Sequence, residues 1–301
     1  MSDAVPAADD LPAIEAVLVQ HLRAVAAELV RPSFGGTPSE HHWASHTQVH
    51  TVDDALAGQA LAERFTRSFP GHGLIIEDLP TLPGDGRHVW YVDPIDGSAN
   101  HLRGIPYVSV TAGLVVDGEP VVGAVHDLIR GTTLSAHRGG GAWRLDPDGR
   151  RTAVTVAPTA HLADAILIAH LARRGPLVSI PGALQHALWH VRKIRCMGSI
   201  ALDLALLAAG EADLLVVGRG GPQRMLDIMG GLVVLREAGG AVMTCAGGPV
   251  SEATRTLLAG PVPLCRAFVE LMAPYELEDW TFERALPPPG AATRPAPGAA
   301  D

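Results

Sequence analysis

The sequence predicts a layered fold of helices and β-sheets, with an α+β half up to about residue 150 and an α/β half after it. Three observations support this prediction. Apolar residues recur at steps of three or four from Ile14 to Leu29, which indicates an amphipathic helix. Between Tyr107 and Leu145, apolar stretches of strand length are separated by short turns. After about residue 160, strand-like and helix-like segments alternate, as they do in layered α/β proteins.

The first half, residues 1–150, is predicted to contain two helices followed by a set of strands. The first helix has Pro12 in its first turn, a position that tolerates proline, and the second runs from near Asp53 to about Ser68. A loop rich in Gly, Ser and His separates them over residues 33–50. The predicted strands are Leu74–Ile76, His88–Val92, Tyr107–Val116, Pro120–His126, Thr132–Ala136 and Ala142–Leu145. The turn Asp117–Gly118 joins two of these strands as a hairpin, and a polar turn over residues 146–151 marks the end of this half.

The second half, residues 151–286, is predicted to carry two well-delimited helices. Ser199 has the side chain of a helix N-cap, and Gly210 ends the helix that follows. A further helix covers Met225–Glu237. The other predicted elements are a helix over residues 181–192 and the strands Ala165–Ala169, Ile194–Cys196, Asp213–Val217 and Ala241–Thr244. Residues 287–301, dominated by proline, glycine and alanine, are predicted to be a disordered tail.

The composition excludes several classes of function. The formal net charge is −9, so no basic excess exists with which to bind a nucleic-acid backbone. The longest apolar region, Ile200–Val217, is interrupted by three acidic residues and is not a membrane-spanning helix. No signal peptide is visible, and three widely spaced cysteines suit a reducing compartment, so we expect a cytoplasmic protein. Lys193 is the only lysine beside many arginines, a bias that hints at a GC-rich bacterial genome.

The segment Asp93–Asn100, with the sequence DPIDGSAN, carries the clearest chemistry in the chain. Two carboxylates, Asp93 and Asp96, flank a backbone carbonyl directly after a predicted strand, and hard divalent cations prefer such oxygen ligands. Gly97 and Ser98 follow, and a glycine lets backbone N–H groups approach a phosphate oxygen. The alternative is an Asp-rich turn in which both carboxylates only accept bonds from backbone donors.

Residues Trp90–Asn100 closely resemble the first fingerprint of the inositol monophosphatase family, which are Mg-dependent, lithium-sensitive phosphatases related to fructose-1,6-bisphosphatase. Three further motifs follow the order of that family over roughly residues 12–275. They are the strand end Leu74–Asp78, the segment Thr51–Asp54 at a helix start, and the run Leu226–Gly240. The short segment Gly198–Ala201 is similar to the one that opens a substrate-side helix in the family.

This resemblance implies a five-layered αβαβα sandwich and a set of site residues. Two to three Mg²⁺ ions would be held by Glu77, Asp93, the Ile95 carbonyl, Asp96 and Asp227. Catalytic roles would fall to Asp54, Glu77 and Ser98, of which Asp54 and Ser98 would orient and deprotonate the attacking water. Gly97 and Ser98 would bind phosphate. The predicted substrate-binding residues are Asp96, Gly198, Ser199, Ile200, Arg219 and Arg224.

Other interpretations of the acidic residues stay open at this point. Asp227 lies in an apolar helical segment and is either a metal ligand or a buried acid bonded to a helix end; an unpaired buried carboxylate is costly, which favours the ligand. Asp54 is either the catalytic acid or only a cap at the helix start, a task that Asp53 could also perform. Glu77 with Asp78 could be a solvated strand end.

The chain departs from the family pattern at several positions. Ile76 stands where glycine is usual, Leu226 where tryptophan is usual, and Gln48 and His50 replace an aspartate and a valine. The histidines of the loop over residues 41–50 suggest a transition-metal site or a substrate-gripping lid, but their spacing is irregular and favours a plain surface loop. The departures in this loop put the third metal position in doubt.

The predicted substrate is a small phosphorylated metabolite, either a polyol phosphate or a sugar phosphate. The family places a hydroxyl-binding glutamate shortly before its second fingerprint, whereas the stretch here has no acid and contains Arg219 and Arg224. A guanidinium suits a second anionic group better than a hydroxyl. Histidinol phosphate, a sugar bisphosphate and a nucleotide 3′-phosphate therefore remain alternatives, as does a metal-binding homologue without turnover. The resemblance also implies a homodimer that does not bind nucleic acid or membrane.

Overall fold

In the computed structural model of the chain, the structure describes residues 6–7, 9–36, 41–43, 49–170, 186–217, 225–251, 254 and 256–274. The helices are α1 (Leu11–Val25), α2 (Arg31–Ser33), α3 (Val52–Ser68), α4 (Ser98–Arg103), α6 (Ile200–Ala208), α7 (Met225–Glu237) and α8 (Val262–Met272), with a π-helical turn at Ala26–Val30 and a 3₁₀ turn at Leu162–Asp164. The strands are β1 (His41–Trp43), β2 (Val49–Thr51), β3 (Gly73–Ile76), β4 (His88–Asp96), β5 (Ser109–Val116), β6 (Glu119–Asp127), β7 (Thr133–His137), β8 (Ala142–Leu145), β9 (Arg151–Val154), β10 (Ile166–His170), β11 (Lys193–Arg195), β12 (Leu214–Val217), β13 (Gly240–Met243) and β14 (Leu257–Pro261).

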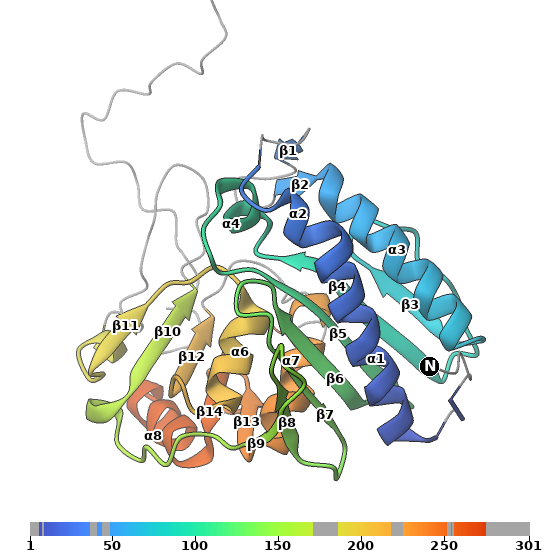
Figure 1. Cartoon of the computed structure of the whole chain (residues 1–301). Helices are drawn as coiled ribbons and strands as arrows, with labels where there is room; N and C mark the ends of the chain where they lie inside the picture. Colours follow the sequence, from blue (N-terminus) through green and yellow to red (C-terminus); the bar gives the residue numbers. More distant parts are fainter. Residues whose placement is uncertain are drawn as a thin grey trace, which may run out of the picture.

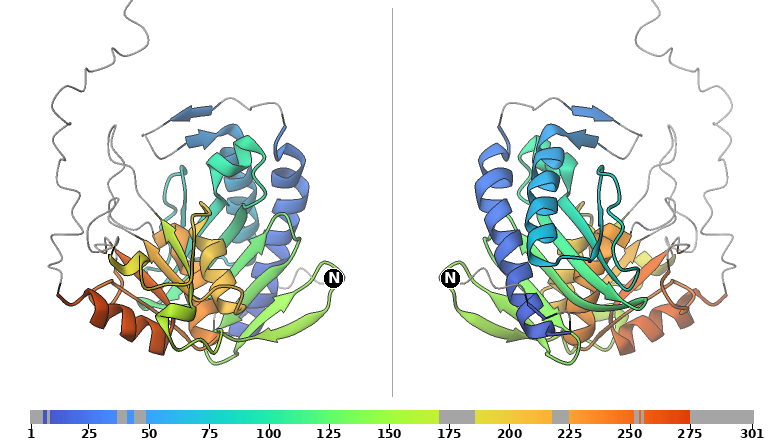
Figure 2. Two further views of the ribbon diagram at one scale, coloured as in Figure 1. Left: turned by 90° about the vertical axis from the view of Figure 1, so that its left-hand side faces the viewer. Right: turned by 90° about the vertical axis from the view of Figure 1, so that its right-hand side faces the viewer.

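These elements form five layers, as the sequence predicted (Figure 1). Helices α1 and α3 cover one face of a seven-stranded sheet of order β3-β4-β5-β6-β7-β8-β9. Helices α6 and α7 lie between that sheet and a five-stranded sheet of order β11-β10-β12-β14-β13. Helix α8 packs on the outer face of the second sheet (Figure 2). The buried apolar residues fall into three clusters: one between the first sheet and helices α1 and α3, one around α6 and α7 between the two sheets, and one under α8.

The first sheet shows why the hairpin prediction succeeded. Strands β5 and β6 are joined by Asp117 and Gly118, both with positive φ (52° and 83°), which is the backbone of a two-residue hairpin turn. The sheet continues to Val154, four residues past the boundary placed at residue 150. Strand β9, which the sequence analysis did not predict, pairs with β8 and closes this edge.

The second sheet is buried on both faces. Successive residues along its strands contact opposite sides of the sheet. In β12, Leu215 and Val217 contact the central helices, whereas Leu214 and Val216 contact the α8 side. A strand covered on both faces reads as a continuous apolar run, without the polar alternation of a half-exposed strand. Strand β14 is likewise buried throughout, whereas α8 buries one face only; both elements were absent from the prediction.

Helix α7 approaches the first sheet at backbone distance because glycines face one another across the contact. A Cβ on Gly230 of α7 would lie 2.2 Å from Thr111 Oγ1 and 2.7 Å from the Ala124 carbonyl oxygen. On the sheet side, a Cβ on Gly123 would lie 2.3 Å from the Gly230 carbonyl oxygen. The contact has no room for any side chain, so the position of α7 on the sheet is closely defined.

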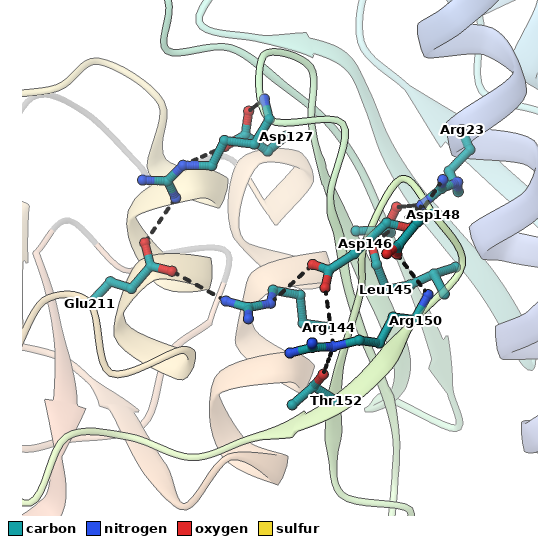
Figure 3. A network of polar contacts seen from close by, with 11 residues as sticks. Arg23, Asp127, Arg144, Leu145, Asp146, Asp148, Arg150, Thr152 and Glu211 are labelled. Carbon is teal, nitrogen blue, oxygen red and sulfur yellow. Dashed lines mark hydrogen bonds and ion pairs between the residues drawn. The ribbon is translucent and has the colours of Figure 1, made fainter.

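Polar contacts also join the two halves at the surface (Figure 3). Glu211, just after α6, accepts from Arg130 Nη1 at 2.8 Å and lies 3.7 Å from Arg144 Nη1. Arg144 also contacts Asp146 at 3.3 Å. Exposed ion pairs of this kind contribute at most about 1 kcal/mol each, so the buried helices carry most of the cohesion between the halves.

Other differences from the predicted elements are local. Strand β4 runs through Asp96, whereas the prediction ended it at Val92. Residues 186–188 of the predicted helix 181–192 are helical, and residues 181–185 and the tail 287–301 lie outside the described residues. The predicted loop over residues 33–50 contains the antiparallel pair β1 and β2.

Two further findings concern the whole described chain. All three cysteines are free thiols. No helix among the described residues is long and apolar enough to span a membrane.

Candidate active site

A β-bulge in β4 places the two carboxylates of the DPID segment on one face of the sheet. In β4 the residue Asp93 pairs with Thr111, and Asp96 pairs with Ser109, so three steps on one strand oppose two on the other. Residues two apart on a strand share a face, and paired residues lie on the same side. Asp93 and Asp96 therefore both lie on the same face of the sheet as Thr111. Helix α7 packs against this face. Pro94, which lacks an N–H donor, is accommodated within the bulge.

Asp96 is held by donors from the second half of the chain. Its Oδ2 accepts from Ser199 Oγ at 2.6 Å and from the Ala201 backbone N–H at 2.7 Å, at the start of α6. Asp96 is only 7% exposed, and Asp227 of α7, 9% exposed, lines the same cavity. Burial, followed by the negative charge of Asp227, raises the pKa of Asp96 well above its usual range, although the bonds from Ser199 and Ala201 oppose this rise.

Asp54 takes part in the cap of α3 and also accepts a hydrogen bond from Ser98. Helix α3 begins at Val52 with Thr51 as N-cap, and Thr51 and Asp54 form a reciprocal capping box. The other carboxylate oxygen, Oδ1, accepts from Ser98 Oγ at 3.0 Å, and Ser98 Oγ lies 2.9 Å from the Ile95 carbonyl oxygen. Burial raises the pKa of Asp54, against the hydrogen bonds from Thr51 and Ser98 that lower it. A carboxylate with a raised pKa is a stronger proton acceptor than an ordinary one.

The cavity beside these carboxylates has a volume of about 170 Å³. Gly97 and Gly198 both line it and lie close together, since a Cβ on Gly97 would be 3.4 Å from the Gly198 carbonyl oxygen; their φ values of +100° and +96° are ones that only glycine adopts readily. Asn100 fixes this arrangement by donating from Nδ2 to the carbonyl oxygens of Tyr107 and Met197, both at 2.9 Å. The cavity is lined by Val49, Ile95, Asp96, Gly97, Ser98, Ala99, His170, Gly198, Ile200 and Asp227.

The remaining predicted residues take different positions. Glu77 follows β3, and its N–H donates to the Val92 carbonyl at 3.2 Å; its charge acts on Asp54. Ser199 is fully buried and supports Asp96, whereas its neighbours Gly198 and Ile200 line the cavity. Arg219 and Arg224 lie outside the described residues.

One group in the cavity wall was missed by the sequence analysis. His170, the last residue of β10, contacts Asp203 of α6 through Nε2. Asp203 is fully buried and also accepts from the Tyr107 hydroxyl at 2.6 Å. An acid inside the apolar helix 200–208 was a usable signal for Asp203, by the reasoning applied to Asp227.

The donor set suits a hard divalent cation. Asp93, Asp96 and Asp227 are buried acids, the first two share a face, and the last two repel each other across a cavity. Such a grouping is expensive unless positive charge offsets it. Among the described residues, no group of three or more His, Cys, Asp or Glu side chains is placed to hold a metal ion by itself. Mg²⁺ typically takes one or two carboxylates and completes its ligands with waters and substrate phosphate.

Comparison with known proteins gives a consistent answer. The model of the inositol monophosphatase family matches residues 10–275. The inositol-1-monophosphatase of Mesorhizobium japonicum is 33% identical over 224 residues, covering 72% of this chain and 80% of that protein. The fructose-1,6-bisphosphatase/inositol-1-monophosphatase of Thermotoga maritima is 31% identical, covering 66% and 72%. The crystal structure of the extragenic suppressor protein suhB from Bartonella henselae superposes with a TM-score of 0.77 at 26% identity, covering 86% of this chain and 98% of that one.

The fold and the acidic cavity define a phosphoric monoester hydrolase, in agreement with these relatives. The chain belongs to the inositol monophosphatase family.

Proposed function

We propose that the protein is a Mg²⁺-dependent phosphatase that removes phosphate from a small polyol or sugar monoester. The observation that carries the proposal is a small cavity lined by Asp96, Asp227 and Ser98, with Asp93 on the same face of the sheet as Asp96. Asp93, Asp96, Asp227, Glu77 and the Ile95 carbonyl would hold the ions. Magnesium, when bound, would neutralise charge on the phosphate oxygens and make a water more acidic.

Each residue of the site would then have a separate role in phosphate release. Ser98 and Asp54, joined by a 3.0 Å hydrogen bond, orient a water and take its proton, for which the raised pKa of Asp54 is suitable. Gly97, without a side chain, leaves its backbone open to the phosphate. Asp96, fixed by Ser199 and Ala201, stays in place when the leaving alcohol departs.

The test is a phosphate-release panel over phosphorylated polyols, sugars, nucleotides and histidinol phosphate, each measured with Mg²⁺ and with EDTA. We expect turnover of a polyol or sugar ester in Mg²⁺, its loss in EDTA, and its return when excess Mg²⁺ is added. Full activity in EDTA contradicts the proposed role of the ions. Release only from a nucleotide or from histidinol phosphate would move the substrate to that class. No release from any ester would favour a binding role without turnover.

We also propose a homodimer. Trp189 is 83% exposed, and the neighbouring β11, whose three residues are exposed, lies at the edge of its sheet as far as the described strands go. This region therefore offers an apolar side chain and a strand edge to a second copy of the chain. Light scattering is the direct measurement: a mass near twice 31.5 kDa supports the dimer, and a mass near 31.5 kDa rejects it.

A further inference from the structure

A histidine with a defined orientation lines the same cavity as the DPID segment. His170 ends β10, a central strand of the second sheet, and its side chain is 19% exposed. It lines the cavity together with Asp96 and Asp227.

Asp203 fixes the orientation of this imidazole. Its Oδ2 is bonded to His170 Nε2, and its Oδ1 accepts from the Tyr107 hydroxyl at 2.6 Å. Asp203 is fully buried on the first turn of α6, so it is held by the helix as well as by these donors. A carboxylate that accepts through both oxygens requires a hydrogen on Nε2, and Nδ1 is then the ring nitrogen that can serve a ligand.

The surroundings favour the charged imidazolium. Burial alone would lower the pKa of His170, but the hydrogen bond that its Nε2 donates to Asp203 and the negative charges of Asp203, Asp96 and Asp227 together raise it. These acids reach the ring from α6, β4 and α7, respectively. Cations bound by Asp96 and Asp227 would offset their charges, whereas the contribution of Asp203 would remain.

The segment that leads into Asp227 has no carboxylate side chain that could accept a hydrogen bond from a substrate hydroxyl. The sequence from Val217 to Leu226, which leads into Asp227, contains no acidic residue. An imidazolium donates and does not accept, so it suits a carboxylate or phosphate better than a polyol hydroxyl. We propose that His170, oriented by Asp203, is the specificity-determining residue of this phosphatase and binds a second anionic group of the substrate. This inference rests on the proposed function.

The test uses pairs of esters that differ only in the second group. Glycerol 3-phosphate and 3-phosphoglycerate compare a hydroxymethyl group with a carboxylate, and fructose 1-phosphate and fructose 1,6-bisphosphate compare a hydroxyl with a phosphate. The full-length protein is measured with Mg²⁺ as wild type, His170→Gln and the control His161→Gln, whose side chain is exposed. We expect wild type to favour the member with the second anionic group in at least one pair. His170→Gln should lower that preference, the ratio of kcat/KM values within the pair, at least tenfold and mainly through KM.

Each of the other outcomes of this experiment also supports or overturns the inference. The control should leave the ratio unchanged. If His170→Gln lowers kcat/KM equally for both members of each pair, His170 acts in catalysis or folding and not in recognition, and the inference is wrong. An unchanged ratio also overturns it. Loss of preference only in the carboxylate pair, or only in the phosphate pair, identifies which anion is bound. Thermal unfolding of each variant shows whether the substitution has damaged the fold.

Failure of the proposed function would be distinguishable from failure of this inference. If wild type releases no phosphate from any ester, the esters stay intact, and calorimetry then measures their binding directly. His170→Gln should still weaken binding of 3-phosphoglycerate or of fructose 1,6-bisphosphate relative to its partner by at least tenfold. Equal affinity of wild type and His170→Gln for all four esters would reject the inference on its own.

Discussion

The substitution Asp93→Asn is expected to lower kcat/KM for phosphate release by at least a hundredfold, or about 2.7 kcal/mol of transition-state stabilisation. Asp93 is fully buried, and the bulge in β4 directs it to the same face as Asp96. Its Oδ1 accepts from the Ile95 N–H at 3.0 Å, which holds the side chain in place. Asparagine keeps the shape of the side chain but loses the charge and one of the two oxygen ligands that a bridging carboxylate offers to a pair of cations.

The matched control is Asp148→Asn, the same chemical change in an exposed turn. It should leave kcat/KM within twofold of wild type. Asp93→Asn should not lower the melting temperature without Mg²⁺, because it removes a buried charge from a group of acids that repel one another. A variant that is folded and keeps more than about a tenth of wild-type turnover would show that Asp93 does not bridge two ions.

The second large effect concerns stability. Gly230→Ala should lower the free energy of unfolding by about 3 kcal/mol, because overpacking at a closed contact typically costs this order of energy. The new Cβ would lie 2.7 Å from the Ala124 carbonyl oxygen and 2.8 Å from that of Ala112, both backbone atoms that cannot rotate away. The helix must therefore shift, and Asp227 lies three residues earlier on the same helix. We expect kcat/KM to fall together with stability.

The control for this prediction is Gly58→Ala in the interior of α3. A Cβ at Gly58 would meet only side-chain carbons of Leu79, Ile76 and Pro94, at 3.3–3.4 Å. The gain in helix propensity of alanine over glycine, about 1 kcal/mol, should offset the small adjustment that these side chains make. Urea unfolding measures both variants. If Gly230→Ala is as stable as Gly58→Ala, the close helix–sheet contact does not govern the position of α7.

The sequence analysis was most successful where the signal is local. The turn Asp117–Gly118 needs two left-handed residues, and the hairpin follows from it. The N-terminal helix follows from a regular apolar period, and the helix after Ser199 follows from its cap, whose hydroxyl accepts from the Leu202 N–H at 3.3 Å. The five-layered arrangement followed from the resemblance to a family and not from these local patterns.

The prediction was weakest for elements whose type and bounds depend on the segments that cover them or pair with them. Strand β14 is an apolar run of five residues buried on both faces, and such a run does not by itself distinguish a strand from a helix. Strand β9 has alternate residues exposed and takes its identity from pairing with β8. The end of β4 was placed too early because the bulge continues the pairing past Pro94, and a proline in a sequence normally argues against a strand.

For the site, too, the sequence and the tertiary structure each determined a different part. By itself the sequence determined which residues have the right chemistry: Asp93 and Asp96 at a glycine-bearing turn, and Asp227 as an acid in an apolar helix. Only the tertiary structure decided that Asp54 serves as helix cap and as partner of Ser98, and that His170 and Asp203, 33 residues apart, meet at the cavity. The physical reason is that the functional group of a side chain is given by its residue type, whereas its hydrogen-bond partner and its charge state depend on burial and distance. Burial and distance are set only when strands and helices from both halves of the chain pack together.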